Sequence, residues 1–426
     1  MFWLVETKEQ LQQLPHSEEI FVELVLYHDR IHPALNCISC IYIRAVDQSK
    51  GFMLALSHNE ALPLQYQDIV EALSRYKTIF VRDKKQFLYF FNLKRVKDIN
   101  LIQQVKVDCT TPTHEILYRK NHQLDYINTF IPIGKHYERC EEIYNKVTPV
   151  FTSDIPDHFK FYNNDATKIF WYIEKQGIHV THPEDCLDLQ NPQYSIGDGR
   201  IYTHYNLYTT TTRPSNAFNG VNFAGLNKED GTRKFLTSQN DFLLEIDING
   251  YHPTLIANVI GYDLGSDGVY EHFAKVLDVE VSEAKELMFR QLYGGISKEY
   301  THLEYFKEVD RLINDLWNDY RSEGYVKCLL SDYKFDGYNI ENINKQKLFN
   351  YYIQNLETTN NIRILKEILP LLTGKTKLVL YTYDAFLFDV SKEEKQMIQQ
   401  IVDTFTQHNL KIKMSYGGNY DSLRRL

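Results

Sequence analysis

The chain has no hydrophobic run long enough to cross a membrane. A spanning helix needs about 20 consecutive apolar residues, and the 426-residue sequence has no stretch of that kind. The opening "MFWLVETKEQLQQ" carries charges where a signal peptide has its apolar region. Internal repeats and low-complexity segments are also absent from the sequence. We therefore expect a soluble, cytoplasmic protein with no membrane partner.

An excess of positive charge is missing as well. The sequence has 47 Lys and Arg against 56 Asp and Glu, which gives a formal net charge of −9. A protein that coats nucleic acid through bulk positive charge has the opposite balance. Any contact with nucleic acid must therefore come from locally clustered Arg and Lys side chains.

Cysteine is scarce, with six in the chain, and only Cys37 and Cys40 have a spacing typical of metal ligands. His28 and His32 lie close by in the sequence, so a zinc site is one interpretation. However, the segment "CISCIYIR" is typical of a strand, in which the two thiols would point to opposite faces. The sequence therefore favours two buried small side chains over a zinc site.

Strand and helix patterns alternate along the chain and predict a multidomain protein of the α/β and α+β classes. With 43% hydrophobic residues, the chain can bury substantial cores, and its length suits two or three domains. Residues 18–58 contain three strand-like runs, followed by a helical pattern and another strand, so we expect an α/β domain up to about residue 130. Two helices are expected between residues 134 and 182, the second ending at Gly177.

Two acidic residues stand at the ends of predicted strands. In "FLLEIDI" an apolar strand, expected to be buried on both faces, reaches Asp247 just before Gly250 and Pro253 end it. In "KLVLYTYDAFLFDV" Asp384 lies at the tip of a predicted β-hairpin. An isolated aspartate at a strand end is most often a turn or cap residue. Two carboxylates on adjacent strand ends could instead share a pair of Mg²⁺ ions about 3.5–4 Å apart, which suits phosphoryl or nucleotidyl transfer.

Between these acids, "VSEAKELMFRQLYGG" predicts a helix with Ser282 as its N-cap and the Gly-Gly pair as its end. Lys285, Phe289 and Tyr293 are spaced by four residues, so they share one face of that helix. A cation followed by two aromatic rings suits a nucleotide, with the lysine on phosphate and the rings on sugar and base. The alternative is that both rings belong to the core and the lysine extends along the surface.

The order of these segments resembles motifs A, B and C of template-directed polymerases, and specifically of family A (Pol I-like) DNA polymerases. The spacing K-x3-F-x3-Y-G in "KELMFRQLYG" matches the fingers helix of that family. Three further stretches resemble its T-x-x-G-R-x-S segment with the Asn-rich stretch after it, its F-N-x-x-x-Q and its G-x-N-W ending: "TTTTRPSNAFNGVNFAGLNKEDGTRKF", "FNYYIQ" and "YGGNYDSLRRL". The resemblance covers roughly residues 200–426, about half of the chain.

The resemblance implies a role for each matching residue. Asp247 and Asp384 would be the catalytic pair, and with the backbone carbonyl of Ile248 they would bind two Mg²⁺ ions, for which Mn²⁺ can substitute. The residues that would contact the incoming dNTP are Lys285, Phe289, Tyr293, His252 and Arg290. The residues that would contact primer-template DNA, in part through the minor groove, are Arg213, Asn222, Arg233, Asn350 and Gln354.

Three positions depart from the family pattern. Val281 stands where the family has an arginine, so one triphosphate contact is missing unless Arg290 supplies it. Motif C reads Tyr-Asp-Ala instead of His-Asp-Glu, so the auxiliary carboxylate is missing unless Asp389 substitutes. His252 stands where a glutamate normally excludes ribonucleotides, and where the tyrosine gate of family B polymerases stands. Its ring can exclude a 2′-hydroxyl by bulk, but an RNA polymerase or primase that uses rNTPs stays open as an alternative.

The resemblance also divides the chain into parts. Residues 1–130 would be an RNase H-like domain in the place of the family's 3′–5′ exonuclease. The D-x-E motif of that exonuclease reads "FVE" here, with Phe21 at the Asp position and Glu23 remaining, so we expect a vestigial, inactive scaffold. The other expected parts are a helical connector with a reduced thumb at 131–199, the right-hand palm at 200–258 and 346–426, and the fingers at 259–345.

The thumb is expected to be small because only about thirty residues separate the stretch Glu174–Val180, which resembles the family's E-x-x-G-I-x-V, from the T-x-x-G-R segment. A reduced thumb predicts low unaided affinity for DNA, so a processivity factor or replisome protein is an expected partner. The leading hypothesis is a compact DNA polymerase without proofreading, of phage type, in a bacterial or phage-infected cell. The non-enzymatic alternative is a polymerase-derived nucleic-acid-binding or structural subunit. The missing arginine, glutamate and thumb favour this alternative.

Overall fold

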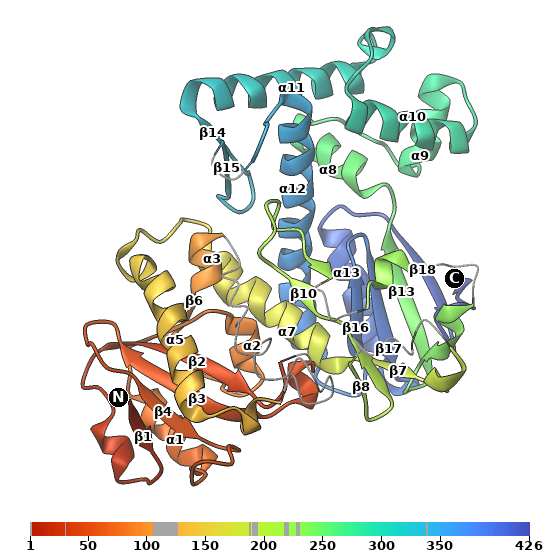
Figure 1. The fold of residues 1–426 in the computed structure, drawn as a ribbon. Helices are drawn as coiled ribbons and strands as arrows, with labels where there is room; N and C mark the ends of the chain where they lie inside the picture. Colours follow the sequence, from red (N-terminus) through yellow and green to blue (C-terminus); the bar gives the residue numbers. More distant parts are fainter. Residues whose placement is uncertain are drawn as a thin grey trace. The chain divides into compact units, whose positions relative to one another are not determined.

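A computed structural model describes residues 2–29, 31–104, 127–186, 189, 195–216, 221–226, 231–337 and 340–426. The chain forms two compact units, whose elements are labelled in Figure 1. Unit 1 comprises Met1–Lys175, Gln190–Tyr208 and Asn216–Val221, and unit 2 comprises Gln176–Leu189, Thr209–Ser215 and Asn222–Leu426. Within the described ranges, no helix combines the length and the apolar character that a membrane crossing requires.

Unit 1 is built on a six-stranded sheet. Its strands are β1 (Trp3–Val5), β2 (Glu19–Leu26), β3 (Ile38–Ala45), β4 (Phe52–Ala55), β5 (Thr78–Val81) and β6 (Val96–Asp98). The strand order is β1-β4-β3-β2-β5-β6. Strands β2, β3 and β4 are antiparallel neighbours, whereas β5 runs parallel to β2, β6 parallel to β5, and β1 parallel to β4. The predicted order of three strands, a helix and a strand is confirmed, and one further strand lies at each edge.

The helices of unit 1 follow from local sequence signals. Helix α1 (Tyr66–Ser74) buries Ile69 and Leu73, four residues apart, in the core that the sheet's apolar side chains form. The side chains of Asp83 and Asp98 accept backbone N–H groups at the starts of α2 (Lys84–Leu88) and α3 (Ile99–Gln103). The two helices predicted between residues 134 and 182 are confirmed. They comprise α5 (Ile133–Val147) and, after the short α6 (Phe159–Phe161), α7 (Thr167–Gln176), with Gly177 following at a φ of 61°.

Several short strands lie outside the two large sheets. Strands β8 (Ser195–Gly197) and β9 (Arg200–Tyr202) pair antiparallel in unit 1. In unit 2, β7 (Ile178–Val180) pairs antiparallel with β12 (Leu236–Thr237), and β14 (Tyr325–Lys327) with β15 (Lys334–Asp336). Two more two-residue strands are β10 (Tyr205–Asn206) and β11 (Ser215–Asn216).

Unit 2 contains a five-stranded antiparallel sheet in the order β16-β17-β13-β18-β19. These strands are β13 (Phe242–Ile248), β16 (Lys377–Thr382), β17 (Ala385–Val390), β18 (Ile412–Gly417) and β19 (Arg424–Arg425). The predicted strand and hairpin are confirmed. The prediction that β13 is buried on both faces is wrong at Phe242, Glu245 and Asp247, which are only half-buried.

The helices of unit 2 are α8 (Tyr251–Ile260), α9 (Val269–Leu277), α10 (Val281–Gly294), α11 (Glu304–Glu323), α12 (Lys345–Ile368) and α13 (Lys395–Gln407). The predicted N-cap Ser282 is wrong, because α10 already begins at Val281 and its N-cap is Glu280, whose side chain makes no capping bond. The predicted end is confirmed, with Gly295 at a φ of 99°. Helix α12 is unusual because it buries many polar side chains, among them Asn355, Glu357 and Asn361.

Candidate active site

The two predicted acids lie at the same end of the sheet of unit 2. Asp247 pairs with Ala385 in the register between β13 and β17. Asp384 belongs to the tight turn between β16 and β17, which consists of Tyr383 and Asp384. The N–H of Ile248 donates to the carbonyl oxygen of Asp384 at 2.8 Å, and this bond ties the backbones of the two acidic positions together.

The electrostatic environment disfavours ionisation of both carboxyl groups. Burial, the charge of Asp384 and that of Glu245 raise the pKa of Asp247 to about 6, although Lys413 and Lys285 act in the opposite direction. Burial and the charge of Glu357 raise the pKa of Asp384. Negative charge is therefore gathered here without enough positive charge from the chain. Carboxylate oxygens are the ligands that Mg²⁺ prefers, and a divalent cation would relieve this repulsion, so the pair fits such an ion.

A buried carboxylate that sequence analysis missed lies next to the acids. Glu357 of α12 is 1% exposed. Its Oε2 lies 3.0 Å from Nε of Arg213 and 3.2 Å from Nε2 of His252. The guanidinium of Arg213 in turn lies 3.8 Å from the ring centre of Tyr383, the neighbour of Asp384. The available signal was an acid three residues after Gln354, in a stretch where the family resemblance assigned no role.

The tip of the hairpin is held by further buried groups of unit 2. Tyr383 has a φ of 71°, a left-handed conformation that is strained for a bulky residue. Nδ2 of Asn361 donates to the Tyr383 carbonyl at 2.8 Å and to Oη of Tyr381 at 2.9 Å. Oη of Tyr251 donates to Oδ1 of the same asparagine at 2.7 Å. These contacts fix the backbone at Asp384.

The predicted stripe on α10 exists and faces away from the core. The rings of Phe289 and Tyr293 are stacked with centres 5.7 Å apart, and Phe289 is 41% exposed. Nζ of Lys285 lies 5.7 Å from the ring centre of Tyr270 on α9, and its charge lowers the pKa of Asp247, so it acts on the acidic end of the sheet. Arg290 is exposed on the same helix. The interpretation of Phe289 as a core residue is therefore wrong.

The residues expected to contact DNA fall into two places. Arg213 belongs to the network of Glu357, and Nδ2 of Asn350 donates to the carbonyl of Tyr293 at 3.5 Å. Gln354 is half-buried on α12, one turn before Glu357. Asn222 and Arg233 lie elsewhere. Asn222 is exposed at the start of a 3₁₀ turn, and Arg233 donates to the carbonyl of Leu226 at 2.9 Å and lies over the ring of Tyr420.

The suggestion that Asp389 replaces the missing auxiliary carboxylate is wrong. Asp389 pairs with Leu243 and Lys377, at the opposite end of β17 from Asp384. Its carboxylate accepts the backbone N–H groups of Gln239 and Asn240 at 3.0 Å each. Four residues of strand separate it from Ala385, which is about 13 Å at the usual rise per residue. Asp389 therefore stabilises a loop, and the third carboxylate near Asp384 is Glu357.

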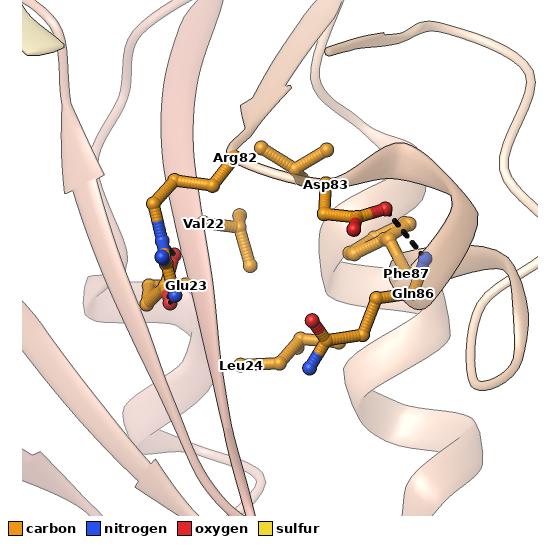
Figure 2. A pocket seen from close by; sticks show the side chains of 8 residues that line it. Val22, Glu23, Leu24, Arg82, Asp83, Gln86 and Phe87 are labelled. Carbon is orange, nitrogen blue, oxygen red and sulfur yellow. Dashed lines mark hydrogen bonds and ion pairs between the residues drawn. The ribbon is translucent and has the colours of Figure 1, made fainter. Parts of the chain in front are cut away.

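In unit 1, the remaining acid of the degenerate D-x-E motif has an internal cation. Glu23 lies in a small, open pocket lined by residues of β2 and by the segment that starts α2 (Figure 2). Nε of Arg82 lies 2.9 Å from both carboxylate oxygens of Glu23. The other acid in the pocket, Asp83, accepts the N–H of Gln86 at 2.9 Å as the N-cap of α2. Both carboxylates are thus engaged by groups of the chain.

Two three-residue groups in the described ranges have ligand atoms close enough to hold a metal ion: His32, Glu174 and His204, and the exposed His182, Glu184 and Asp185. The first already surrounds a cation, because the buried ammonium of Lys85 forms an ion pair with Glu174. Neither group contains the predicted zinc candidates Cys37 and Cys40. Cys37 is exposed and lies just before β3, whereas Cys40 is buried within that strand, so the prediction that both are buried is wrong.

Comparisons with known proteins give a clear result for the fold. No protein-family profile and no curated protein matches the sequence. Among solved structures, the chain is similar to the POL domain of Pol1 from M. smegmatis, in a complex with DNA primer-template and dNTP. The TM-score is 0.68, the sequence identity is 13%, and the similarity covers 99% of this chain and 99% of that one. The chain therefore has the fold of a DNA polymerase domain.

Proposed function

We propose that this protein is a template-directed DNA polymerase of the family A (Pol I-like) type, which adds dNTPs to the 3′ end of a primer. One observation carries the proposal. In a chain with a polymerase-domain fold, Asp247 and Asp384 lie at the same end of the sheet. Burial and neighbouring carboxylates raise the pKa of each, so a cation bound there would stabilise their charged forms. Lys285 acts electrostatically on the same place.

Two Mg²⁺ ions, or Mn²⁺ in their place, would be held by Asp247, Asp384 and the backbone carbonyl of Ile248. When bound, such ions lower the pKa of the primer 3′-hydroxyl and neutralise charge on the triphosphate and the pyrophosphate leaving group. The chain's own residues prepare this chemistry. The Ile248–Asp384 backbone bond holds the two acids at one sheet end, and Asn361 fixes the hairpin tip.

The incoming dNTP would be bound by the exposed stripe of α10. Lys285 supplies a positive charge for the triphosphate, and the stacked rings of Phe289 and Tyr293 offer a flat apolar surface to sugar and base. Arg290 and His252 would complete the nucleotide contacts. Primer-template DNA would be bound by Arg213, Asn222, Arg233, Asn350 and Gln354, of which Arg213 and Asn350 lie in the network around Glu357 and Tyr293.

The N-terminal part is proposed to be a vestigial RNase H-like exonuclease that does not proofread. The mixed sheet supports this, since three antiparallel strands are followed by two parallel ones on the side of β2. The absence of a free acid pair in the described pocket also supports it, because Arg82 engages Glu23 and Asp83 caps α2. The division into connector, palm and fingers, and a processivity partner, remain parts of the same proposal.

The test is extension of a labelled primer-template with Mg²⁺ and either four dNTPs or four rNTPs, with Asp384→Ala protein beside the wild type. Extension with dNTPs only, lost in the variant, is the expected result. Extension with rNTPs, or synthesis without a primer, would instead favour an RNA polymerase or primase. Absence of extension with either set, also with Mn²⁺ and at low salt, would favour the polymerase-derived binding or structural subunit.

A further inference from the structure

Glu357 stands at the centre of a charged network that the proposed catalytic chemistry does not use. The same oxygen, Oε2, faces Nε of Arg213 at 3.0 Å and Nε2 of His252 at 3.2 Å. Oε1 accepts a further bond from Nη2 of Arg213 at 3.3 Å. Burying a carboxylate is costly unless hydrogen-bonding and charged partners compensate it. Arg213 already supplies the compensating charge, so the contact with His252 serves to orient the imidazole ring.

The ring of His252 has a close neighbour at each nitrogen. Nδ1 forms a hydrogen bond with the hydroxyl of Tyr293. Nε2 lies 3.2 Å from Oε2 of Glu357, a close contact that does not have the geometry of a hydrogen bond. Glu357 comes from α12, His252 from the first turn of α8, and Tyr293 from the exposed stripe of α10. An imidazole fixed by two other helices cannot turn aside without breaking both contacts.

We propose that Glu357 is a positioning residue for sugar selection. By holding His252 against Tyr293, it keeps the imidazole as a rigid wall that excludes the 2′-hydroxyl of an incoming ribonucleotide. The inference rests on the proposed function, because it assumes that the nucleotide binds along α10 near Asp247. Steric selection against the 2′-hydroxyl requires a side chain that keeps its position. Without Glu357, the ring of His252 could rotate and leave room for the 2′-hydroxyl.

The experiment measures kcat/KM for single incorporation of dCTP and of CTP opposite a template G. The proteins are the wild type, Glu357→Ala, Glu357→Gln, His252→Ala and the double variant Glu357→Ala/His252→Ala. We expect Glu357→Ala and His252→Ala each to lower the preference for dCTP at least about tenfold. The double variant should lose no more of this preference for dCTP than either single variant, because both changes remove the same steric barrier. Glu357→Gln keeps an acceptor and should fall between wild type and Glu357→Ala.

The matched control is Asp389→Asn, which changes another buried carboxylate, at the end of β17 that lies away from Asp384. Its preference for dCTP should equal that of the wild type. A purely structural role of Glu357 would lower incorporation of both nucleotides by the same factor, or would add to the effect of His252→Ala, and either result overturns the inference. Urea unfolding checks every variant, and Glu357→Gln decides the outcome if Glu357→Ala does not fold. Wild-type protein that extends no primer would overturn the proposed function first, and this inference with it.

Discussion

Two acids of unit 1, Glu23 and Glu174, differ from the acid pair of unit 2 in how their charge is compensated. In unit 1, Glu174 is fully buried against the ammonium of Lys85 and near His204, and Glu23 is held by Arg82. Burial alone would raise the pKa of Glu174, but Lys85 and His204 outweigh it and lower that pKa strongly. In unit 2, Asp247 and Asp384 have no such internal cation in direct contact within the described residues, and the pKa of Asp247 is raised to about 6.

A carboxylate whose cation comes from the chain is already neutralised in the fold. A raised pKa alone does not mark a site for an outside cation, because Asp98 of unit 1 has a pKa raised to about 7 while its carboxylate accepts the N–H groups of Lys84 and Leu101. In the proposed site, two acids with raised pKa values lie together, and a cation from outside would relieve their repulsion. Glu357 shows that the distinction applies to each residue, because it lies in unit 2 but is compensated by Arg213. The predictions below test the contrast in order of decreasing effect.

The largest effect is expected for activity in unit 2. Asp247→Asn or Asp384→Asn removes a proposed metal ligand, so primer extension should fall at least about 10³-fold, which corresponds to about 4 kcal/mol. Neither change should lower the free energy of unfolding, since each relieves repulsion between neighbouring acids. Gel-based primer extension and urea unfolding measure the two quantities. A variant that loses activity because it unfolds would show that the acids are structural.

The next effect is expected for stability in unit 1. Lys85→Met leaves the carboxylate of Glu174 buried without its ammonium partner, and it should lower the free energy of unfolding by about 3–5 kcal/mol. Adding Glu174→Gln removes the uncompensated charge and should restore part of that loss. Urea unfolding followed by circular dichroism measures both proteins. A loss for Lys85→Met below about 1 kcal/mol would contradict the view that Lys85 is the cation of this cluster.

A smaller effect is expected from the titration of Asp247. Its pKa is about 6 in the metal-free fold and near the ordinary value of about 4 in the unfolded chain. The native state therefore binds more protons between pH 4 and pH 6, and its free energy of unfolding falls as the pH rises through that range. Because the side chain is partly exposed, the loss should be about 1 kcal/mol.

Urea unfolding at pH 4.5 and pH 7, with EDTA present, measures this change. The control is Asp247→Asn, which has no carboxyl group at this position and should show a smaller loss over the same interval. Identical pH dependence of the free energy of unfolding for the two proteins would mean that the surroundings of Asp247 do not raise its pKa.

The smallest effect is expected for Arg82→Met in unit 1. Arg82 pairs with Glu23 as Lys85 pairs with Glu174, but its side chain is 20% exposed, whereas that of Lys85 is 1% exposed. Water can solvate Glu23 when the arginine is removed, so the loss should be about 1 kcal/mol or less. Unfolding in parallel with Lys85→Met gives the comparison. Equal losses for the two variants would mean that burial does not set the strength of these pairs.

Much of the fold could be predicted because its signals are local. The strand to Asp247, the hairpin at Asp384 and the Lys285 helix follow from periodicity and turn residues within short stretches. The start of the helix was misplaced by two residues, because Ser282 resembled an N-cap although Glu280 holds that position. Boundaries of this kind depend on backbone geometry that several residue types can adopt.

The rest of the site depends on contacts between distant residues. Arg213 and Glu357 are 144 residues apart, and His252 and Tyr293 are 41 apart, so no local pattern links them. The suggestion that Asp389 replaces the auxiliary carboxylate failed for the same reason. Asp389 is near Asp384 in sequence, but a strand carries it to the opposite end of the sheet. Two residues that are close in sequence on one strand can therefore lie far apart in space.

Unit 1 is built from discontinuous segments of the chain, and this has a consequence for its folding during protein synthesis. The unit includes Gln190–Tyr208 and Asn216–Val221, which follow its first segment only after part of unit 2. The backbone N–H of Tyr205 donates to the buried carboxylate of Glu174, and Thr203 donates to the carbonyl of Val221. A ribosome makes these residues after the first segment of unit 1, so unit 1 is not complete when residue 175 has been made. The N-terminal unit must wait, incomplete, until about half of the chain has emerged.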